Sequence, residues 1–417
     1  MLPGAMARGT GLIGVLPRTA GWAGDGRLTV GGVALADVAR EFGTPAFVFD
    51  EQGLRETARE YRAAFTARHP DTDVHFASKA LPCAPVLRIL QEEGLGCDVA
   101  SAGELKIALA AGFDPAKLLL HGNAKSDEDI AHALEAGVGL IVIDGPDDVD
   151  RLDGTRASVL VRVNPAVPGR THAAMDTGGP EAKFGVSLDQ APALIERAAR
   201  ELDLQGLHVH IGSQLLDLDG FGRAAQALAP LGRFPVYDLG GGLGIAYTPD
   251  EHAPTIDDYA AATVKALEHL DPRARLIVEP GRSLVGRSGV TLYEVVTVKR
   301  GARTHVAVNG GMADNLEPML YGQRFAPAIV DQDRPPETCD LVGHHCESGD
   351  VLAPAVPLAT PRRGDLLVMP ATGAYCYSLL NNYNGTRRPP VVLCNEGDAR
   401  LAVRRETYDD LLARDVG

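Results

Sequence analysis

A lysine at the end of an apolar run is the first feature of this sequence that could do chemistry. Residues 74–80 have the composition of a short buried strand, and Lys79 stands at its end. An ammonium group rarely lies there without a partner or a task, because burial disfavours its charge. An amine held in such a place could lose its proton near neutral pH and attack a carbonyl carbon. On this segment alone, an ordinary solvated lysine is the simpler interpretation.

Polar residues also follow the other apolar strands, and this repetition favours a functional lysine. If these strands are parallel and form one barrel, their carboxyl ends meet on one rim, where active sites of such barrels lie. Random surface loops would not be expected to collect such a set. The residues concerned are Asp98 with Ser101, His121 with Asn123, Asn164, His210, the run Gly240, Gly241 and Gly242, and Glu279 with Arg282.

Each of these groups has an ordinary interpretation beside a functional one. The glycine run could be a tight turn, or it could let backbone N–H groups approach a phosphate. No G-x-G-x-x-G or Walker sequence accompanies it, so a dinucleotide or nucleoside triphosphate is not indicated. His208 and His210 could be a half-buried pair on a strand, or His210 could stack on an aromatic cofactor. We find no further ligands that would make them a zinc pair, and we predict no metal site.

Glu279 ends an apolar strand and must be paired or protonated if it is buried. A protonated pyridine nitrogen would be a suitable partner, since the carboxylate keeps the ring cationic. A lysine for an aldehyde, glycines for a phosphate and a carboxylate for a pyridinium together fit pyridoxal 5′-phosphate.

The elements that must position these residues alternate regularly from about residue 51. Short apolar strands separated by amphipathic helices predict a parallel sheet. Eight such units fit a (β/α)8 TIM-type barrel over residues 51–289, for which roughly 250 residues are typical; an open doubly wound sheet is the alternative. The strands are expected to end at Ser78, Val99, Leu120, Ile143, Val163, Ile211, Leu239 and Glu279.

The pattern changes after about residue 289. Residues 290–298, 304–308, 366–369, 390–393 and 399–403 have strand composition, with few helices between them. We therefore expect a C-terminal all-β domain over residues 290–417, which residues 26–50 join. Residues 1–25, rich in Gly and Ala, are expected to form a flexible extension.

Composition narrows the class of protein. The chain of 417 residues has a formal charge of −15, which disfavours nucleic acid or an anionic membrane as its main partner. No apolar run approaches the roughly 20 residues that span a bilayer. The six cysteines are scattered without C-x-x-C spacing, which argues against a disulfide framework. We expect a cytoplasmic enzyme.

Several motifs, in order, resemble the fold-type III, alanine-racemase-like pyridoxal-phosphate decarboxylases, and among them the diaminopimelate decarboxylase family. The resemblance covers roughly residue 27 to the end. It rests on the segments 75–80 (His-Phe-Ala-Ser-Lys-Ala), 97–105, 121–126 (His-Gly-Asn-Ala-Lys-Ser), 183–185, 208–214, 239–245, 279–282 (Glu-Pro-Gly-Arg), 320–322 (Leu-Tyr-Gly), 345–350 (His-Cys-Glu-Ser-Gly-Asp) and 373–377.

The resemblance implies a role for each matching residue. Lys79 resembles the lysine joined to the cofactor, His210 the histidine stacked on its ring, and Glu279 the carboxylate on its pyridine nitrogen. The remaining matches divide between the cofactor, the substrate and proton transfer. The phosphate cradle of the family is matched by Ser213, Gly242, the backbone around Gly281, and Tyr375. Cys346 resembles a proton donor that a neighbouring subunit inserts. Glu347 resembles the residue that binds the distal ammonium of the substrate, and Arg282 and Tyr321 resemble those that bind its distal carboxylate.

The implied enzyme is a homodimer with shared active sites that decarboxylates an amino acid, most closely meso-diaminopimelate to L-lysine. One departure matters: Glu317, four residues before Tyr321, stands where the family usually has an arginine that helps hold the distal carboxylate. Either Glu317 points away and Arg282 suffices, or the enzyme is a paralogue with a different amino-acid substrate. An alanine racemase or a non-catalytic cofactor carrier fits less well, because neither accounts for the Cys346 loop.

Overall fold

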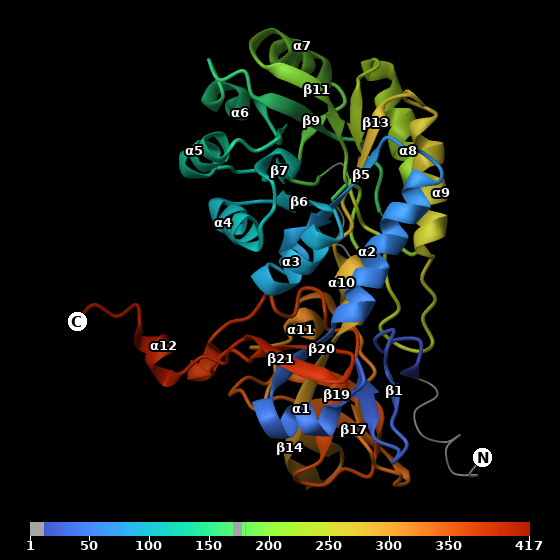
Figure 1. The fold of residues 1–417 in the computed structure, drawn as a ribbon, viewed down its shortest axis with the longest axis vertical. Helices are drawn as coiled ribbons and strands as arrows, with labels where there is room; N and C mark the ends of the chain where they lie inside the picture. Colours follow the sequence, from blue (N-terminus) through green and yellow to red (C-terminus); the bar gives the residue numbers. More distant parts are fainter. Residues whose placement is uncertain (1–11, 170–176, 180) are drawn as a thin grey trace. The chain divides into compact units, whose positions relative to one another are not determined.

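The computed structural model describes residues 12–169, 177–179 and 181–417 (Figure 1). The chain divides into two compact units. The barrel unit consists of Arg55–Ile245 and Ala253–Leu284. The β unit consists of the described residues up to Leu54, together with Ala246–His252 and Val285–Gly417. The loop 246–252 thus leaves the barrel unit, although the sequence places it within the expected barrel.

Eight parallel strands close into a ring in the barrel unit. Each strand pairs in parallel with the next, and β8 pairs with β9 to complete the circle. This confirms the (β/α)8 barrel and excludes the open sheet. In ring order the strands are β9 (Ser158–Asn164), β11 (Asp203–His208), β12 (Val236–Asp238), β13 (Arg275–Val278), β5 (Thr72–Ala77), β6 (Gly96–Val99), β7 (Leu118–Leu120) and β8 (Leu140–Ile143), with the short β10 (Val186–Ser187) beside β9.

Helices follow most of these strands, and polar side chains fix where several of them begin. Ser126 and Asp129 form a capping box at the start of α5, and the Ser101 hydroxyl accepts the Glu104 N–H at the start of α4. The helices are α2 (Glu51–Thr66), α3 (Ala84–Glu92), α4 (Ala102–Ala111), α5 (Asp127–Ala136), α6 (Pro146–Arg151), α7 (Ala191–Glu201), α8 (Asp219–Leu228), α9 (Ile256–Leu267) and α10 (Arg282–Val285), with 3₁₀ turns at η2 (Ser78–Ala80), η3 (Pro115–Lys117) and η5 (Ala229–Leu231).

The interior of the barrel is filled by branched aliphatic side chains. Their removal from water stabilises the ring, by about 1.5–3 kcal/mol for each fully buried side chain. This packed centre leaves the strand ends as the place for polar chemistry. The residues of this cluster are Leu119, Leu140, Val142, Leu160, Val236 and Ile277.

The β unit is built on a nine-stranded sheet in which β14 pairs with three strands. β4 lies between β14 and β20, so an N-terminal strand completes the C-terminal sheet. The strands are β4 (Ala46–Asp50), β14 (Gly289–Arg300), β15 (Thr304–Val308), β16 (Ala328–Ile329), β17 (Pro336–Val342), β18 (Val351–Ala359), β19 (Leu366–Met369), β20 (Val391–Asn395) and β21 (Asp398–Val403). A second sheet contains β1 (Gly21–Trp22), β2 (Leu28–Val30) and β3 (Val33–Ala34), and the helices are α1 (Leu35–Phe42), α11 (Glu317–Tyr321) and α12 (Tyr408–Leu412), with 3₁₀ turns η6 (Gly286–Ser288) and η7 (Tyr383–Gly385).

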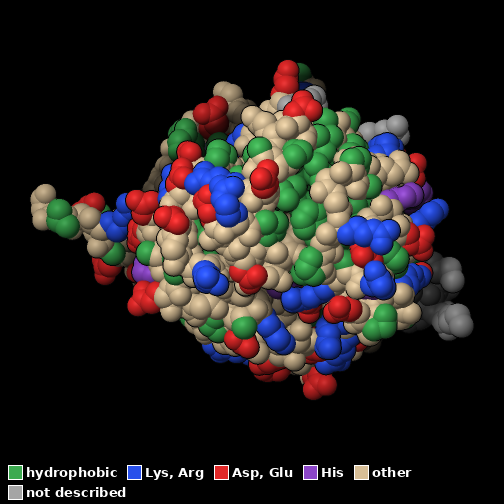
Figure 2. All heavy atoms as spheres, turned by 90° about the horizontal axis from the view of Figure 1, so that it is seen from above, with side chains coloured by type: hydrophobic (Ala, Val, Ile, Leu, Met, Phe, Trp, Pro, Cys, Tyr) green, Lys and Arg blue, Asp and Glu red, His purple; other side chains and the backbone are tan. Residues whose placement is uncertain are grey.

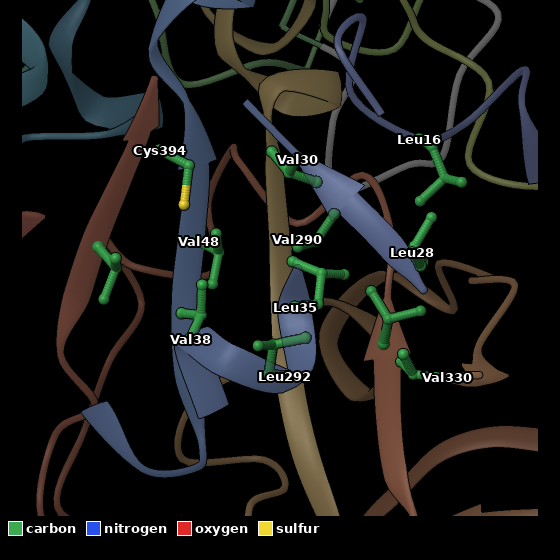
Figure 3. Close-up of a cluster of buried hydrophobic side chains, with 12 residues drawn as sticks. Leu16, Leu28, Val30, Leu35, Val38, Val48, Val290, Leu292, Val330 and Cys394 are labelled. Atoms are coloured by element: carbon green, nitrogen blue, oxygen red, sulfur yellow. The ribbon is translucent and has the colours of Figure 1, made fainter. Parts of the chain in front are cut away.

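A hydrophobic cluster joins the sheet of the β unit to its N-terminal segment (Figure 3). Val290 and Leu292 of β14 face Leu35 and Val38 of α1 in this cluster. Leu16 also packs there and is only 2% exposed. The described part of the N-terminal segment is therefore packed from Leu16 onward, in contrast to the flexible extension expected through residue 25; residues 1–11 lie outside the described part.

Charged side chains of both signs lie among hydrophobic and other side chains on the face drawn in Figure 2. On the face drawn in Figure 2, acidic and basic side chains are interspersed rather than gathered by sign. Within the described ranges, no helix is both long enough and apolar enough to cross a bilayer.

Candidate active site

The carboxyl ends of the barrel strands carry the polar residues that the sequence singled out. Because the strands are parallel and form one ring, these ends share one rim of the barrel unit. The rim residues are Lys79 after β5, Asp98 in β6, His121 after β7, His208 and His210 at and after β11, Asp238 with Gly240, Gly241 and Gly242 at and after β12, and Glu279, Gly281 and Arg282 after β13.

Lys79 lies in the 3₁₀ turn η2, two residues beyond the end of β5. Its neighbours Ser78 and Ala80 are buried, whereas Lys79 is exposed. The end of β13 comes close to this turn, since a Cβ added to Gly281 would lie 3.1 Å from the Ala77 Cβ and 3.2 Å from the Ala80 Cβ. The structure thus corrects one detail of the sequence-based expectation: Lys79 does not lie on the buried strand but on the exposed turn that follows it.

Glu279 is a buried carboxylate held between two histidines. His121 Nε2 lies 2.5 Å from Glu279 Oε1, and His208 Nε2 lies 3.2 Å from Oε2. Burial alone would raise the pKa of Glu279, but the favourable interactions with His121 and His208 outweigh it and hold the pKa well below its usual range. Glu279 is therefore ionised although it is only 5% exposed.

The other buried groups of the rim are held in their neutral forms. Burial raises the pKa of Asp98 to about 7 and that of Asp238 well above its ordinary value. Burial also lowers the pKa of His208 to about 3. The pKa of His210 is well below its ordinary value because of burial and, secondarily, the charge of Lys79. Above about pH 7 Asp98 ionises as well and adds a second negative charge; below it, Glu279 is the charged carboxylate of the three.

The glycine run lies where the ends of three strands crowd together. Gly240 and Gly242 have φ of 68° and 113°, which favour glycine, and a Cβ on Gly241 would lie 1.9 Å from the Glu279 carbonyl oxygen. The Gly241 N–H donates to His210 Nδ1 at 3.1 Å. That bond requires Nδ1 to be an acceptor, so the neutral ring carries its proton on Nε2.

Arg282 is nearly buried, at 4% exposure, beside the loop that follows β11. Its Nε lies 3.4 Å from the Ser213 hydroxyl oxygen. Both side chains belong to the barrel unit, so the structure brings together two residues that the sequence assigned to the substrate and the phosphate.

The remaining predicted site residues belong to the β unit. Cys346 and Glu347 are exposed on the loop before β18, where the Cys346 N–H donates to Asn384 Oδ1 at 2.8 Å. Tyr375 has a φ of 62°, a left-handed conformation that non-glycine residues rarely adopt and that often marks functional positions. Tyr321 ends α11 and is partly exposed.

Glu317 begins α11 and is fully buried. The Tyr247 hydroxyl lies 3.5 Å from its Oε2, and Tyr247 in turn packs edge-on against Phe325. Glu317, where the resemblance leads one to expect an arginine, is thus part of the packed interior of the β unit and not a surface residue.

Comparison with known proteins decides the family. The sequence profile described as "Pyridoxal-dependent decarboxylase, pyridoxal binding domain" matches residues 52–286. A protein of Actinosynnema pretiosum called diaminopimelate decarboxylase is 45% identical, over 94% of this chain and 93% of its own. The chain belongs to the diaminopimelate decarboxylase family of pyridoxal-dependent decarboxylases. Members of this family are carboxy-lyases, and the chain is accordingly an enzyme of that type with pyridoxal phosphate as its cofactor.

Two further relatives agree with this assignment. The diaminopimelate decarboxylase of Mycobacterium tuberculosis is 42% identical, over 94% of this chain and 95% of its own. The crystal structure of the M. jannaschii diaminopimelate decarboxylase in complex with L-lysine has a TM-score of 0.89 at 30% identity, covering 96% of this chain and 98% of its own.

The residues of the rim fit the cofactor of the family. Glu279 is ionised and has acceptor positions beyond those that the two histidines occupy, so it can receive a pyridinium N–H. The glycine run has no side chains where the strand ends crowd together, and the N–H groups of Gly240 and Gly241 already donate to Asp238 and His210. The Ser78 hydroxyl, next to Lys79, is buried without a hydrogen-bond partner among the described residues, as expected at a site built for a polar ligand.

Sequence reasoning missed the function of three residues at this rim. His121 was noticed only as a residue at a strand end, His208 was considered only as a partner of His210, and Asp238 was not singled out. The structure instead places His121, His208, Asp238 and Glu279 so that one ligand-type atom of each lies within 4.8 Å of the others. A signal was present in the sequence, because each follows or ends an apolar strand and cannot be buried without a polar partner.

Proposed function

We propose that this enzyme converts meso-diaminopimelate to L-lysine and CO₂. The single observation that carries the proposal is the buried, ionised Glu279 on the same rim as the turn that presents Lys79. The names of the relatives and the lysine complex of the M. jannaschii protein support this substrate.

Pyridoxal phosphate, when bound, supplies an electron-withdrawing ring that accepts the electron pair left behind by CO₂. Around it, the Lys79 amine would hold the aldehyde carbon, and Glu279 would hold a proton at the pyridine nitrogen. His210 would lie against the ring, with its orientation fixed by the Gly241 N–H. Ser213, the glycine run, the backbone of Gly281, and Tyr375 would bind the phosphate. Asp98 lies 4.0 Å from His121 Nε2, and burial raises its pKa to about 7, so it would lie beside the His121–Glu279 contact.

The Cα atom of the substrate needs a proton after CO₂ leaves. Cys346 would donate it from Sγ, because its loop is exposed and its backbone is held by Asn384. We propose that a second copy of the chain supplies this loop, so that the working enzyme is a homodimer with shared active sites. Size measurement of the loaded enzyme tests the dimer, and a monomer with full activity would contradict it.

The two ends of the substrate require different partners. Glu347 would bind the distal ammonium, and Arg282 with Tyr321 would bind the distal carboxylate. Arg282 is already positioned by its contact with Ser213.

One observation favours a second candidate, a paralogue that decarboxylates a different amino acid. Glu317 carries a carboxylate where the resemblance expects an arginine; its burial beside Tyr247 also fits a side chain that points away from the substrate, so the substrate panel decides between the two. A carboxylate near the distal carboxylate of diaminopimelate would repel it, whereas it would attract a cationic end group.

A decarboxylation panel separates the two candidates. Purified enzyme loaded with pyridoxal phosphate is incubated with meso-diaminopimelate, lysine, ornithine and arginine, and CO₂ and amine products are measured. Turnover of diaminopimelate alone supports the first candidate. Turnover of lysine, ornithine or arginine, without turnover of diaminopimelate, supports the paralogue. Borohydride reduction followed by peptide mass analysis should place a pyridoxyl group on Lys79, and its absence there would remove the basis of both.

The six cysteines are all free thiols, which suits a reducing compartment, and we propose the cytoplasm as the place of action.

A further inference from the structure

We propose that His121 and His208 are positioning residues for Glu279: by donating their Nε2–H groups to its two oxygens, they keep the carboxylate ionised and so set the protonation of a pyridine nitrogen bound beside it. The inference rests on the proposed role of Glu279 and adds two residues to which no role has been assigned.

The geometry is that of a clamp across the barrel rim. His121 follows β7 and His208 ends β11, and neither strand is a neighbour of β13 in the ring. The two imidazoles nevertheless meet edge-to-face, with ring centroids 4.7 Å apart. Each ring directs Nε2 to a different oxygen of Glu279, at 2.5 Å and 3.2 Å. Each oxygen of the carboxylate therefore has its own imidazole partner, which opposes rotation of the group.

The environment of His208 determines which of its nitrogens carries the proton. His208 is 1% exposed, and its Nδ1 has no hydrogen-bond partner among the described residues. A neutral imidazole has one N–H group. A proton on Nδ1 would leave a buried donor unpaired and would bring two acceptors together at Nε2. His208 is accordingly the Nε2–H tautomer and donates to Glu279.

The neighbouring carboxyls explain why such a clamp is needed. Asp98 and Asp238 lie on the same rim, and burial raises the pKa of each. Without donors of its own, Glu279 would be subject to the same burial and would tend to take up a proton. Asp98 approaches the histidines only through a 4.0 Å separation from His121 Nε2, whereas Glu279 has both at hydrogen-bond distance. The two imidazole donors thus make Glu279 the charged residue among the three buried carboxyls of the rim.

The test measures the protonation state of the ring nitrogen of the bound cofactor. Enzyme loaded with pyridoxal phosphate labelled with ¹⁵N in the ring is compared by NMR in the wild type and in His121→Leu and His208→Leu. The ¹⁵N resonance is expected at the protonated position in the wild type and shifted towards the unprotonated position in each leucine variant. Loss of one charge-assisted hydrogen bond should also weaken cofactor affinity by roughly ten- to a hundredfold. His121→Gln and His208→Gln keep an N–H donor and should restore most of the wild-type signal.

Matched controls separate positioning from a general loss of packing. His75→Leu removes another buried histidine of the barrel unit, and no described hydrogen bond joins that ring to Glu279; its ¹⁵N signal should stay as in the wild type. If a leucine variant fails to fold, His208→Asn replaces it, because the shorter amide cannot reach Glu279 and should give the leucine-like signal.

Glu279→Gln separates a failure of the proposed role of Glu279 from a failure of the proposed role of the two histidines. If Glu279→Gln leaves the ¹⁵N signal unchanged, the proposed role of Glu279 itself is wrong. If Glu279→Gln removes the protonated signal while both leucine variants retain it, Glu279 needs no clamp and the inference is overturned.

Discussion

Replacing Lys125 by methionine should lower the free energy of unfolding by about 3 kcal/mol or more, because it removes a buried charge from a buried partner. The Lys125 side chain is inaccessible to solvent. Its Nζ donates to the carbonyl oxygens of Gly122 and Val142, both at 2.7 Å, and lies 2.7 Å from Asp148 Oδ2. This single amine therefore joins the end of β7 to the end of β8 and to α6.

A second ion pair with the same N···O distance shows how the free energy of such a contact depends on burial. Arg68 NH2 also lies 2.7 Å from a carboxylate oxygen, that of Asp257, but the two side chains are 30% and 68% exposed. Exposed pairs contribute about 0–1 kcal/mol, whereas breaking a buried pair costs about 3–5 kcal/mol. Lys125→Met leaves the Asp148 carboxylate 7% exposed, with the Asp144 N–H at 2.8 Å and the Arg151 guanidinium at 3.5 Å as remaining donors. These donors place the expected loss at the lower end of the range.

Urea unfolding of the loaded enzyme measures the effect, with Arg68→Met as the exposed control. The double variant Lys125→Met/Asp148→Asn removes both charges and keeps an acceptor for the Asp144 N–H. It should therefore recover part of the loss, so that the two substitutions are not additive. A loss for Lys125→Met no larger than that for Arg68→Met would refute the reasoning that burial determines the energy of this contact.

Three further predictions concern pH, proton transfer and specificity. Burial raises the pKa of Asp314 from 3.8 to about 7, so the folded state binds this proton more tightly and stability falls between about pH 4 and pH 7, by roughly 4 kcal/mol. Asp314→Asn cannot ionise and should gain stability over the wild type between pH 5 and pH 8; parallel unfolding curves would contradict this. Cys346→Ser should lower kcat by roughly 10²- to 10⁴-fold with an unchanged cofactor spectrum, and an unchanged kcat in a CO₂-release assay would argue against the thiol as donor. Glu317→Gln should raise kcat/KM for diaminopimelate relative to ornithine if the buried carboxylate repels a distal carboxylate, and an unchanged ratio in the substrate panel would show that Glu317 does not face the substrate.

The barrel could be predicted because its signals are local. Each strand is a short apolar run, and caps such as Ser126 mark where helices begin. The β unit was harder to predict, and the sequence missed β16, β17 and β18. Pro354 and Pro357 lie within β18, and proline normally argues against a strand because it cannot donate to the ladder. β18 lies at the edge of its sheet, where such donors are not required.

The types of the site residues could be predicted, but their partners could not. A polar residue after each strand follows from the order of the sequence, and the barrel brings these residues to one rim. The contacts of His208 with Glu279, and of Lys125 with Asp148, join residues 71 and 23 positions apart. The hydrophobic periodicity of the sequence does not distinguish a histidine that is only packed in the core from one that donates a hydrogen bond across the rim, because apolar residues flank both.

The difference among the three buried carboxyls of the rim shows why this matters for function. Asp98, Asp238 and Glu279 look alike in the sequence, each at the end of an apolar strand. Burial penalises the charge of all three, so the charged one is decided by the donors that surround it. Asp238 Oδ1 accepts from the Gly240 N–H, and Glu279 accepts from two imidazoles. Because a pyridinium requires an ionised partner, the strands that supply those imidazoles determine the chemistry as directly as Glu279 itself.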